Sequence, residues 1–274
     1  MTGRRLRAIP AGFDPASLAA IDARLDAIEA DEGVRVLLAI ESGSRAWGFP
    51  SPDSDYDCRF LFVRRTEDYL SPWVRRDVIE DPLEGELDVS GWDLGKALKL
   101  LLKGNAVAVE WLTSPIVYRG DPALHDSLLD FARRWSNRTG IARHYLHLGE
   151  KQRRTYFADG KPVRLKKLFY ALRPAAALRW LRLHPDAAIA PMHFPTLMDE
   201  CDPPAGLAPL VADLIARKAQ TREMGEAPLP EAIVGFVDAE FALARETLPP
   251  SAERPDPAAR EAAESLFRSA LSAG

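Results

Sequence analysis

The hydrophobic and polar positions of the first 120 residues follow both helical and strand periodicities. An apolar stripe with steps of three or four residues predicts an amphipathic helix over residues 14–31, with Asp14 as its N-cap. A continuous apolar run over residues 34–40 predicts a buried strand, and further strands are predicted over residues 55–63 and 73–79. The apolar stripe of the helix consists of Leu18, Ile21, Leu25 and Ile28.

The strand over residues 55–63 has two faces of opposite character. Because successive side chains of a strand point to opposite faces, Asp55, Asp57 and Arg59 share one face. Three bulkier residues, Tyr56, Cys58 and Phe60, share the other. A later strand, which carries Asp88, is predicted over residues 87–92.

Helical patterns follow. Asp93 is placed to cap a helix over residues 94–103, which Gly104 would end. A short helix over 106–112 and an extended segment over 114–118 complete the first half of the chain.

Beyond Tyr118 the pattern predicts only helices, with a loop over residues 184–204. The predicted helices cover residues 122–136, 138–157, 161–184, 205–220, 229–247 and 257–272. We therefore expect an α/β protein of the α+β kind. A small mixed β-sheet domain over residues 1–120 would precede an all-α domain over residues 121–274 that closes a cleft.

Composition excludes several classes of protein. The chain has 274 residues, of which 47% are hydrophobic and 28% charged, as in globular proteins with a substantial core. No apolar run approaches the roughly 20 residues of a membrane span, and the basic N-terminus has no apolar segment behind it. The two cysteines, Cys58 and Cys201, do not suggest a disulfide framework. These features predict a cytoplasmic protein without a membrane partner.

The net charge of −4 hides an uneven distribution. Residues 133–182 contain 14 Lys or Arg against Glu150 and Asp159, so this segment carries +12 and the remainder −16. A basic segment opposite an acidic site suits a polyanionic ligand. Solvated helix faces would account for the same charges.

A Gly-Ser pair and a carboxylate pair lie ten residues apart. Asp55 and Asp57 on one face of a strand repel each other unless a cation binds between them, and magnesium prefers such oxygen ligands. Gly43 would let backbone N–H groups approach an anion, and Ser44 adds a hydroxyl. If Ser44 opens a helix, further free N–H groups point to the same place. This combination suits a metal-bound nucleoside triphosphate.

These residues resemble the DNA polymerase β-like nucleotidyltransferase superfamily, and within it the RNA ligase-associated (RlaP-like) branch. The resemblance covers roughly residues 35–180 and is carried by three stretches. They read E-S-G-S-R-A-W-G-F with S-D-Y-D, then S-G-W-D-L through E-W-L-x-S-P-I-V-Y, and finally K-K-L-F-Y-A-L-R-P.

The resemblance implies a reaction and a set of catalytic residues. Asp55, Asp57 and Asp88 would be the catalytic carboxylates and the ligands of two magnesium ions, with manganese as an alternative metal. A nucleoside monophosphate would pass from the triphosphate to a hydroxyl by in-line displacement, with pyrophosphate leaving.

The nucleotide would be held by two separate segments. The residues implied by the resemblance are Gly43, Ser44, Arg45, Lys167, Tyr170 and Arg173. Lys166, Tyr170 and Arg173 are also spaced to share one face of the predicted helix 161–184, where Pro174 should cause a kink. A role in packing or on the surface is the alternative for this second group. Arg45 would contact either phosphate or only Asp53.

The substrates remain open at this level. ATP is the expected nucleotide, and the branch name suggests RNA repair with an RNA or tRNA end as acceptor. A protein hydroxyl (AMP transfer) and a small molecule are the other acceptors. A non-catalytic, antitoxin-like nucleotide-binding regulator is the alternative of another class. Such a degenerate member should lack a carboxylate or the Gly-Ser pair, and neither is missing.

Overall fold

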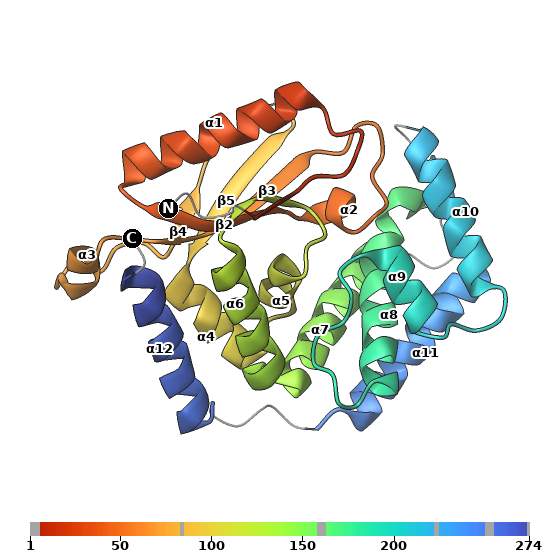
Figure 1. The fold of residues 1–274 in the computed structure, drawn as a ribbon. Coiled ribbons are helices and arrows are strands. Elements are labelled where there is room, and N and C mark those ends of the chain that lie inside the picture. The colour runs from red at the N-terminus through yellow and green to blue at the C-terminus, as the bar shows by residue number, and fades with distance from the viewer. Residues whose placement is uncertain (1–5, 83–84, 158–162, 222–224, 250–254, 273–274) are drawn as a thin grey trace.

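The computed structural model describes residues 6–272 except 83–84, 158–162, 222–224 and 250–254. A six-stranded mixed sheet lies between helices on its two faces, which confirms the predicted α+β class (Figure 1). The strand order is β1-β6-β2-β3-β5-β4, and within this sheet only β3 and β5 pair in parallel. The strands are β1 Leu6–Ala8, β2 Arg35–Glu41, β3 Tyr56–Val63, β4 Val78–Glu80, β5 Leu87–Asp93 and β6 Val117–Gly120.

The helices of the first half begin and end where the sequence indicates. Asp14 caps α1 by accepting hydrogen bonds from the backbone N–H groups of its first turn. Asp93 caps α4 through a 2.8 Å bond from the Gly95 N–H, and Gly104 ends α4 in the left-handed conformation. The helices are α1 Pro15–Glu32, α2 Gly43–Ala46, α3 Thr66–Leu70, α4 Leu94–Lys103 and α5 Ala106–Leu112.

The helices of the second half extend the structure to one side of the sheet (Figure 1). They are α6 Pro122–Trp135, α7 Arg138–Tyr156, α8 Phe169–Leu183, α9 Phe194–Glu200, α10 Leu207–Gln220, α11 Glu231–Thr247 and α12 Pro257–Ser272. No helix in the described parts of the chain combines the length and apolar character needed to cross a membrane.

Two hydrophobic cores lie on the two sides of the sheet. The smaller joins Ile21 and Leu25 of α1 to Cys58 and Phe60 of β3. The larger begins at Leu37 and continues through the helices to residues of α12. It therefore joins the chain before and after residue 120, and the division at 120/121 stays a prediction.

Four local predictions are wrong. The predicted strand 73–79 is reduced to β4, and the predicted loop 184–204 contains α9. The helix predicted over 161–184 begins only at Phe169, after a 3₁₀ turn, Leu165–Lys167; its first two positions lie outside the described residues. A two-stranded ladder of β7 Val163–Arg164 and β8 Glu226–Ala227 also interrupts the all-α part. Pairs of two-residue strands so far apart in sequence leave no periodicity to detect.

Candidate active site

A pocket of about 420 Å³ lies between one end of the sheet and the helices α8 and α10. It brings together six of the nine predicted site residues, from segments more than 100 residues apart. Its walls include Gly43, Ser44, Asp55, Asp57, Lys167 and Tyr170, together with Arg59, Lys166 and Lys218. The predicted residues Asp88, Arg45 and Arg173 are not in this lining.

Gly43 lies directly against Asp57 of β3. Its φ angle is +60°, and a Cβ atom there would lie 2.0 Å from Oδ2 of Asp57. A helix does begin at this point, but at Gly43, so Ser44 is its second residue and not the residue that opens it. The Ser42 N–H donates to the Asp57 carbonyl at 2.8 Å, and the Ser44 hydroxyl bonds that of Ser54 at 2.9 Å. These bonds hold the Gly-Ser turn close to the carboxylates.

Arg59 lies between two of the predicted metal ligands. The parallel register of β3 and β5 places Asp57 opposite Asp88, as expected. One guanidinium nitrogen of Arg59 donates to Asp57 at 3.2 Å and to Asp88 at 2.7 Å. Burial raises the pKa of Asp57, Arg59 lowers it, and the charges of Asp88 and Asp55 raise it further. A cation supplied by the chain itself therefore offsets part of the repulsion that the sequence predicts.

The carboxylates fit a magnesium ion as a pair. Asp55 and Asp57 present oxygen ligands to the pocket in which the lysines lie, and magnesium completes its shell with water and substrate phosphates. In the described ranges no group of three or more His, Cys, Asp or Glu side chains is gathered closely enough for a metal ion, and the role of Asp88 as a third ligand stays a prediction. Asp88 forms an ion pair with Arg59 at 2.7 Å.

Glu41 holds the backbone of β3 at Asp57, a role that the sequence reasoning missed. Its side chain is fully buried, and its Oε1 accepts the backbone N–H of Asp57 at 3.0 Å. The Tyr118 hydroxyl donates to the other oxygen. Burial raises the pKa of Glu41 to about 8. A glutamate at the end of a buried strand, next to the Gly-Ser pair, was the available signal.

Cations approach the carboxylates from the helical half. Lys166 and Lys167 come from the 3₁₀ turn before α8, and Lys167 lies 5.0 Å from the ring centre of Tyr170. Lys218 comes from α10, is 5% exposed, and donates to the Phe49 carbonyl at 2.6 Å. Burial lowers the pKa of Lys218 to about 8. No local pattern singles out Lys218, because only packing brings α10 to the pocket.

Arg45 positions the carboxylate loop. Its guanidinium donates to the backbone carbonyls of Ser54 at 2.6 Å and Asp55 at 3.1 Å, and it lies 3.9 Å from the ring centre of Tyr56. The partners of Arg45 are carbonyl groups and not the Asp53 side chain, and a contact with phosphate stays a prediction. Arg45 therefore fixes the backbone on which Asp55 is presented.

Arg173 is part of the protein interior. It is 4% exposed, forms an ion pair with Glu110, and lies 4.5 Å from the ring centre of Trp47. The predicted shared face with Lys166 fails because Lys166 precedes α8 in the 3₁₀ turn. These are the contacts that the packing alternative describes, and a role of Arg173 in nucleotide binding stays a prediction.

Several arginines of the basic segment 133–182 likewise have ion-pair or hydrogen-bond partners within the protein. Arg179 and Arg182 both pair with Glu240, and Arg153 pairs with Asp238. Arg138 donates to two backbone carbonyls. These four arginines of the segment are therefore held by contacts within the protein.

A carboxylate pair, a glycine turn in contact with it and lysines across the pocket define the class of nucleotidyltransferase sites. The family comparison agrees. A model described as "RlaP: RNA repair pathway DNA polymerase beta family" matches residues 18–269, and the chain belongs to this family. "Uncharacterized protein YcgL" of Bacillus subtilis (strain 168) is 38% identical over 217 residues, which are 79% of this chain and 82% of that protein.

Proposed function

We propose that this protein transfers a nucleoside monophosphate, AMP in the first instance, from a triphosphate to a hydroxyl of RNA during repair. The observation that carries the proposal is the meeting of Asp55 and Asp57 with Lys167 and Lys218 in one pocket beside Gly43. A triphosphate needs cations along its phosphates and carboxylates for its metal. The family description supports the RNA setting.

In this proposal the residues of the pocket position the reacting groups. Lys167 and Lys218 bind the β- and γ-phosphates, and the Gly43–Ser44 turn adds its polar groups. Asp55 and Asp57 would hold magnesium, which when bound neutralises charge on the reacting phosphate oxygens. The acceptor oxygen forms a bond to the α-phosphorus while the bond to the β-phosphate oxygen breaks. Pyrophosphate leaves, and the hydroxyl proton passes to Asp88 or to water beside it.

Arg59 belongs to the same scheme as a positioning residue. Its bonds to Asp57 and Asp88 hold the two carboxylates of neighbouring strands at a defined separation before substrate binds. A second magnesium ion shared with Asp88 would require Arg59 to give up these bonds.

We also propose a cytoplasmic location, because Cys58 and Cys201 are buried free thiols.

The test measures label transfer from each of the four α-labelled nucleoside triphosphates, with magnesium, into a mixture of tRNA and total cell protein. Label in the RNA fraction that disappears in Asp55→Ala/Asp57→Ala supports the proposal. Asp126→Ala/Asp130→Ala is the matched control, since both are exposed carboxylates of α6 far from the pocket lining. Label confined to protein would reassign the acceptor, and failure of the wild type to bind any triphosphate would refute the proposed site.

A further inference from the structure

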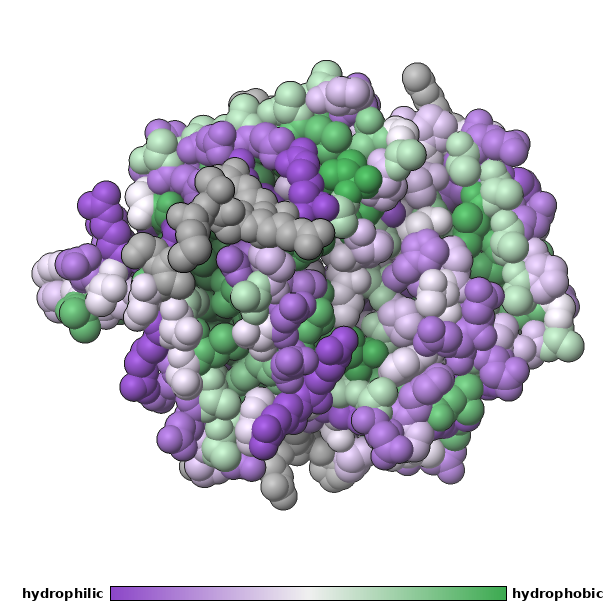
Figure 2. All heavy atoms as spheres, viewed as in Figure 1, coloured by the Kyte–Doolittle hydropathy of each residue, from purple (hydrophilic) through white to green (hydrophobic). Residues whose placement is uncertain are grey.

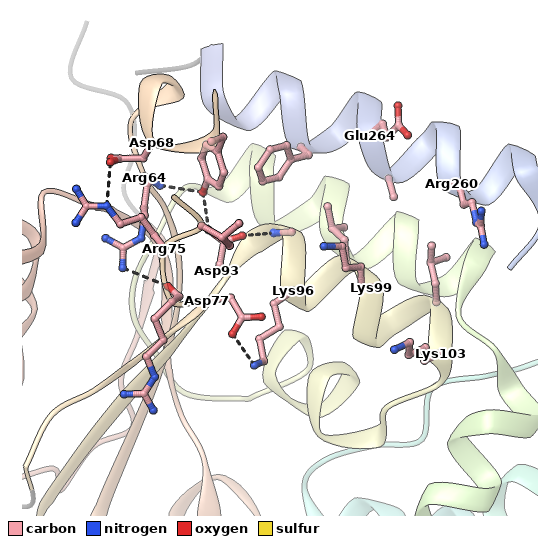
Figure 3. A pocket seen from close by; sticks show the side chains of 18 of the residues that line it. Arg64, Asp68, Arg75, Asp77, Asp93, Lys96, Lys99, Lys103, Arg260 and Glu264 are labelled. Atoms are coloured by element: carbon pink, nitrogen blue, oxygen red, sulfur yellow. Dashed lines mark hydrogen bonds and ion pairs between the residues drawn. The ribbon is translucent and has the colours of Figure 1, made fainter. Parts of the chain in front are cut away.

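A second hollow lies at the other end of β5 from the catalytic carboxylates. Asp88 is near the start of β5, whereas Asp93 at its end lines a groove of about 910 Å³ (Figure 3). The walls of the groove come from α3 and the segment after it, from α4, and from α12. Asp93 is five steps along the strand from Asp88, a distance of about 17 Å.

The groove is basic in a chain that is acidic overall. Seven Lys or Arg and four Asp or Glu line it, while the net charge of the chain is −4. The four carboxylates already have partners. Asp68 pairs with Arg75, Asp77 with Lys96 and Glu264 with Arg268, and Asp93 bonds Tyr69 and the Gly95 N–H.

Three cations of the groove have no such partner. Within the described residues, the side chains of Lys99, Lys103 and Arg260 form no ion pair or hydrogen bond. Lys96, Lys99 and Lys103 follow one face of α4, and Arg260 stands on α12 across from them (Figure 3). Like charges on facing walls repel one another, and a bound polyanion would relieve that repulsion.

An exposed aromatic residue, Trp73, directly precedes the lining residues Val74, Arg75 and Arg76 in the sequence and is not itself part of the lining. The segment after α3 projects from the body of the protein and carries both hydrophobic and hydrophilic atoms (Figures 1 and 2). Trp73 is 82% exposed and Val74 94% exposed, and Arg75 and Arg76 follow directly. Aromatic rings next to cations are what single-strand binding proteins use to stack bases while holding the phosphates.

We propose that this groove binds single-stranded RNA, with phosphates on Lys99, Lys103 and Arg260 and a base stacked on Trp73. The inference rests on the proposed function, because it makes the groove the place where the acceptor strand is held while one end reaches the catalytic pocket. The basic segment 133–182 is a weaker candidate, since many of its arginines are paired internally.

The test is fluorescence anisotropy of a fluorescein-labelled oligouridylate titrated with the full-length protein at several salt concentrations. Each phosphate contact on a single strand contributes about 0.7 to the slope of log K against log salt. Lys99→Gln/Lys103→Gln/Arg260→Gln should lower that slope by about 2. Trp73→Ala should weaken binding about tenfold and leave the slope unchanged.

The control is Lys151→Gln/Arg154→Gln, which removes two exposed cations of α7 outside the groove lining. An unchanged slope in the groove variant, an equal loss in the control, or no binding by the wild type at low salt would overturn the proposal. So would tighter binding of the matched deoxyoligomer. Magnesium–ATP titrated into the same samples reports separately on the catalytic pocket, whose lining these substitutions do not touch.

Discussion

At the scale of single residues, the contact between Gly43 and Asp57 is the most restrictive feature of the site. Replacing Gly43 with Ala places a Cβ atom 2.0 Å from Oδ2 of Asp57 and puts a non-glycine residue at φ +60°. We expect nucleotide transfer to fall about 100-fold, because small displacements of catalytic groups are costly. The free energy of unfolding should fall by about 1–2 kcal/mol. Initial rates and thermal melts measure the two effects.

The variant Gly33→Ala separates the effect of the clash with Asp57 from the effect of the positive φ angle. Gly33 has φ +62°, and a Cβ atom there would meet nothing within 4 Å. The Gly33→Ala variant should therefore lose a similar amount of stability while keeping its activity. Equal activity in the two variants would contradict the importance of the Gly43–Asp57 contact.

Lys218 should make nucleotide binding depend on pH. Burial lowers its pKa to about 8, so the ammonium is charged below that pH and neutral above it. The affinity for ATP should therefore decrease as the pH rises through about 8. Lys218→Met removes the charge at every pH, so its affinity should be lower below pH 8 and should lack this decrease. Isothermal titration across the pH range measures both, and an unaltered pH profile in the variant would rule out Lys218 as the source.

At the scale of elements, the buried ion pair between α5 and α8 joins the two halves of the chain. Arg173→Met leaves Glu110 charged in the interior, where its remaining partner is the Tyr145 hydroxyl at 2.8 Å. We expect a loss of about 3–5 kcal/mol in the free energy of unfolding. Arg173→Met/Glu110→Met should recover much of it. Denaturant unfolding measures these values.

The exposed pair Arg76–Glu80 provides the control, and Arg76→Met should change stability by less than about 0.5 kcal/mol. The same experiment tests the resemblance-based role of Arg173. If Arg173 acts only in packing, the double variant binds ATP with wild-type affinity. A selective loss of ATP binding in a fully folded double variant would restore its predicted role in nucleotide binding.

At the scale of the whole molecule, the larger hydrophobic core predicts one cooperative unfolding transition. Its members run from Leu37 of β2 to Ala270 of α12, so neither half can lose its packing alone. The calorimetric and van't Hoff enthalpies should agree, and ATP with magnesium at 100 times its Kd should stabilise the whole transition by about 2.7 kcal/mol. Two separate transitions would instead support independent domains at the 120/121 boundary.

Local pattern was sufficient for most of the fold and for part of the site. Helix capping by Asp14 and Asp93 depends on neighbours within a few residues. The same holds for the close spacing that brings Asp55 and Asp57 to one pocket, although Asp55 lies just before the first residue of β3. The meeting of Asp57 and Asp88 was expected from the family resemblance, because alternation along each strand gives the face of a residue but not the register between strands. The start of α8 at Phe169 was not predictable, because it follows the two-residue ladder that β7 forms with the distant strand β8.

The sequence by itself determined the class of site: two carboxylates on one strand face beside a Gly-Ser pair, on an α+β fold. Apart from Lys167, which the resemblance implied, only the tertiary structure decided which cations line that pocket. It brought Lys218 to Phe49 across 169 residues of chain, placed Arg59 between two aspartates, and enclosed Arg173 with Glu110. The physical reason is that backbone geometry fixes periodicity and caps over a few residues, whereas the partner of a long charged side chain depends on which helix packs beside it.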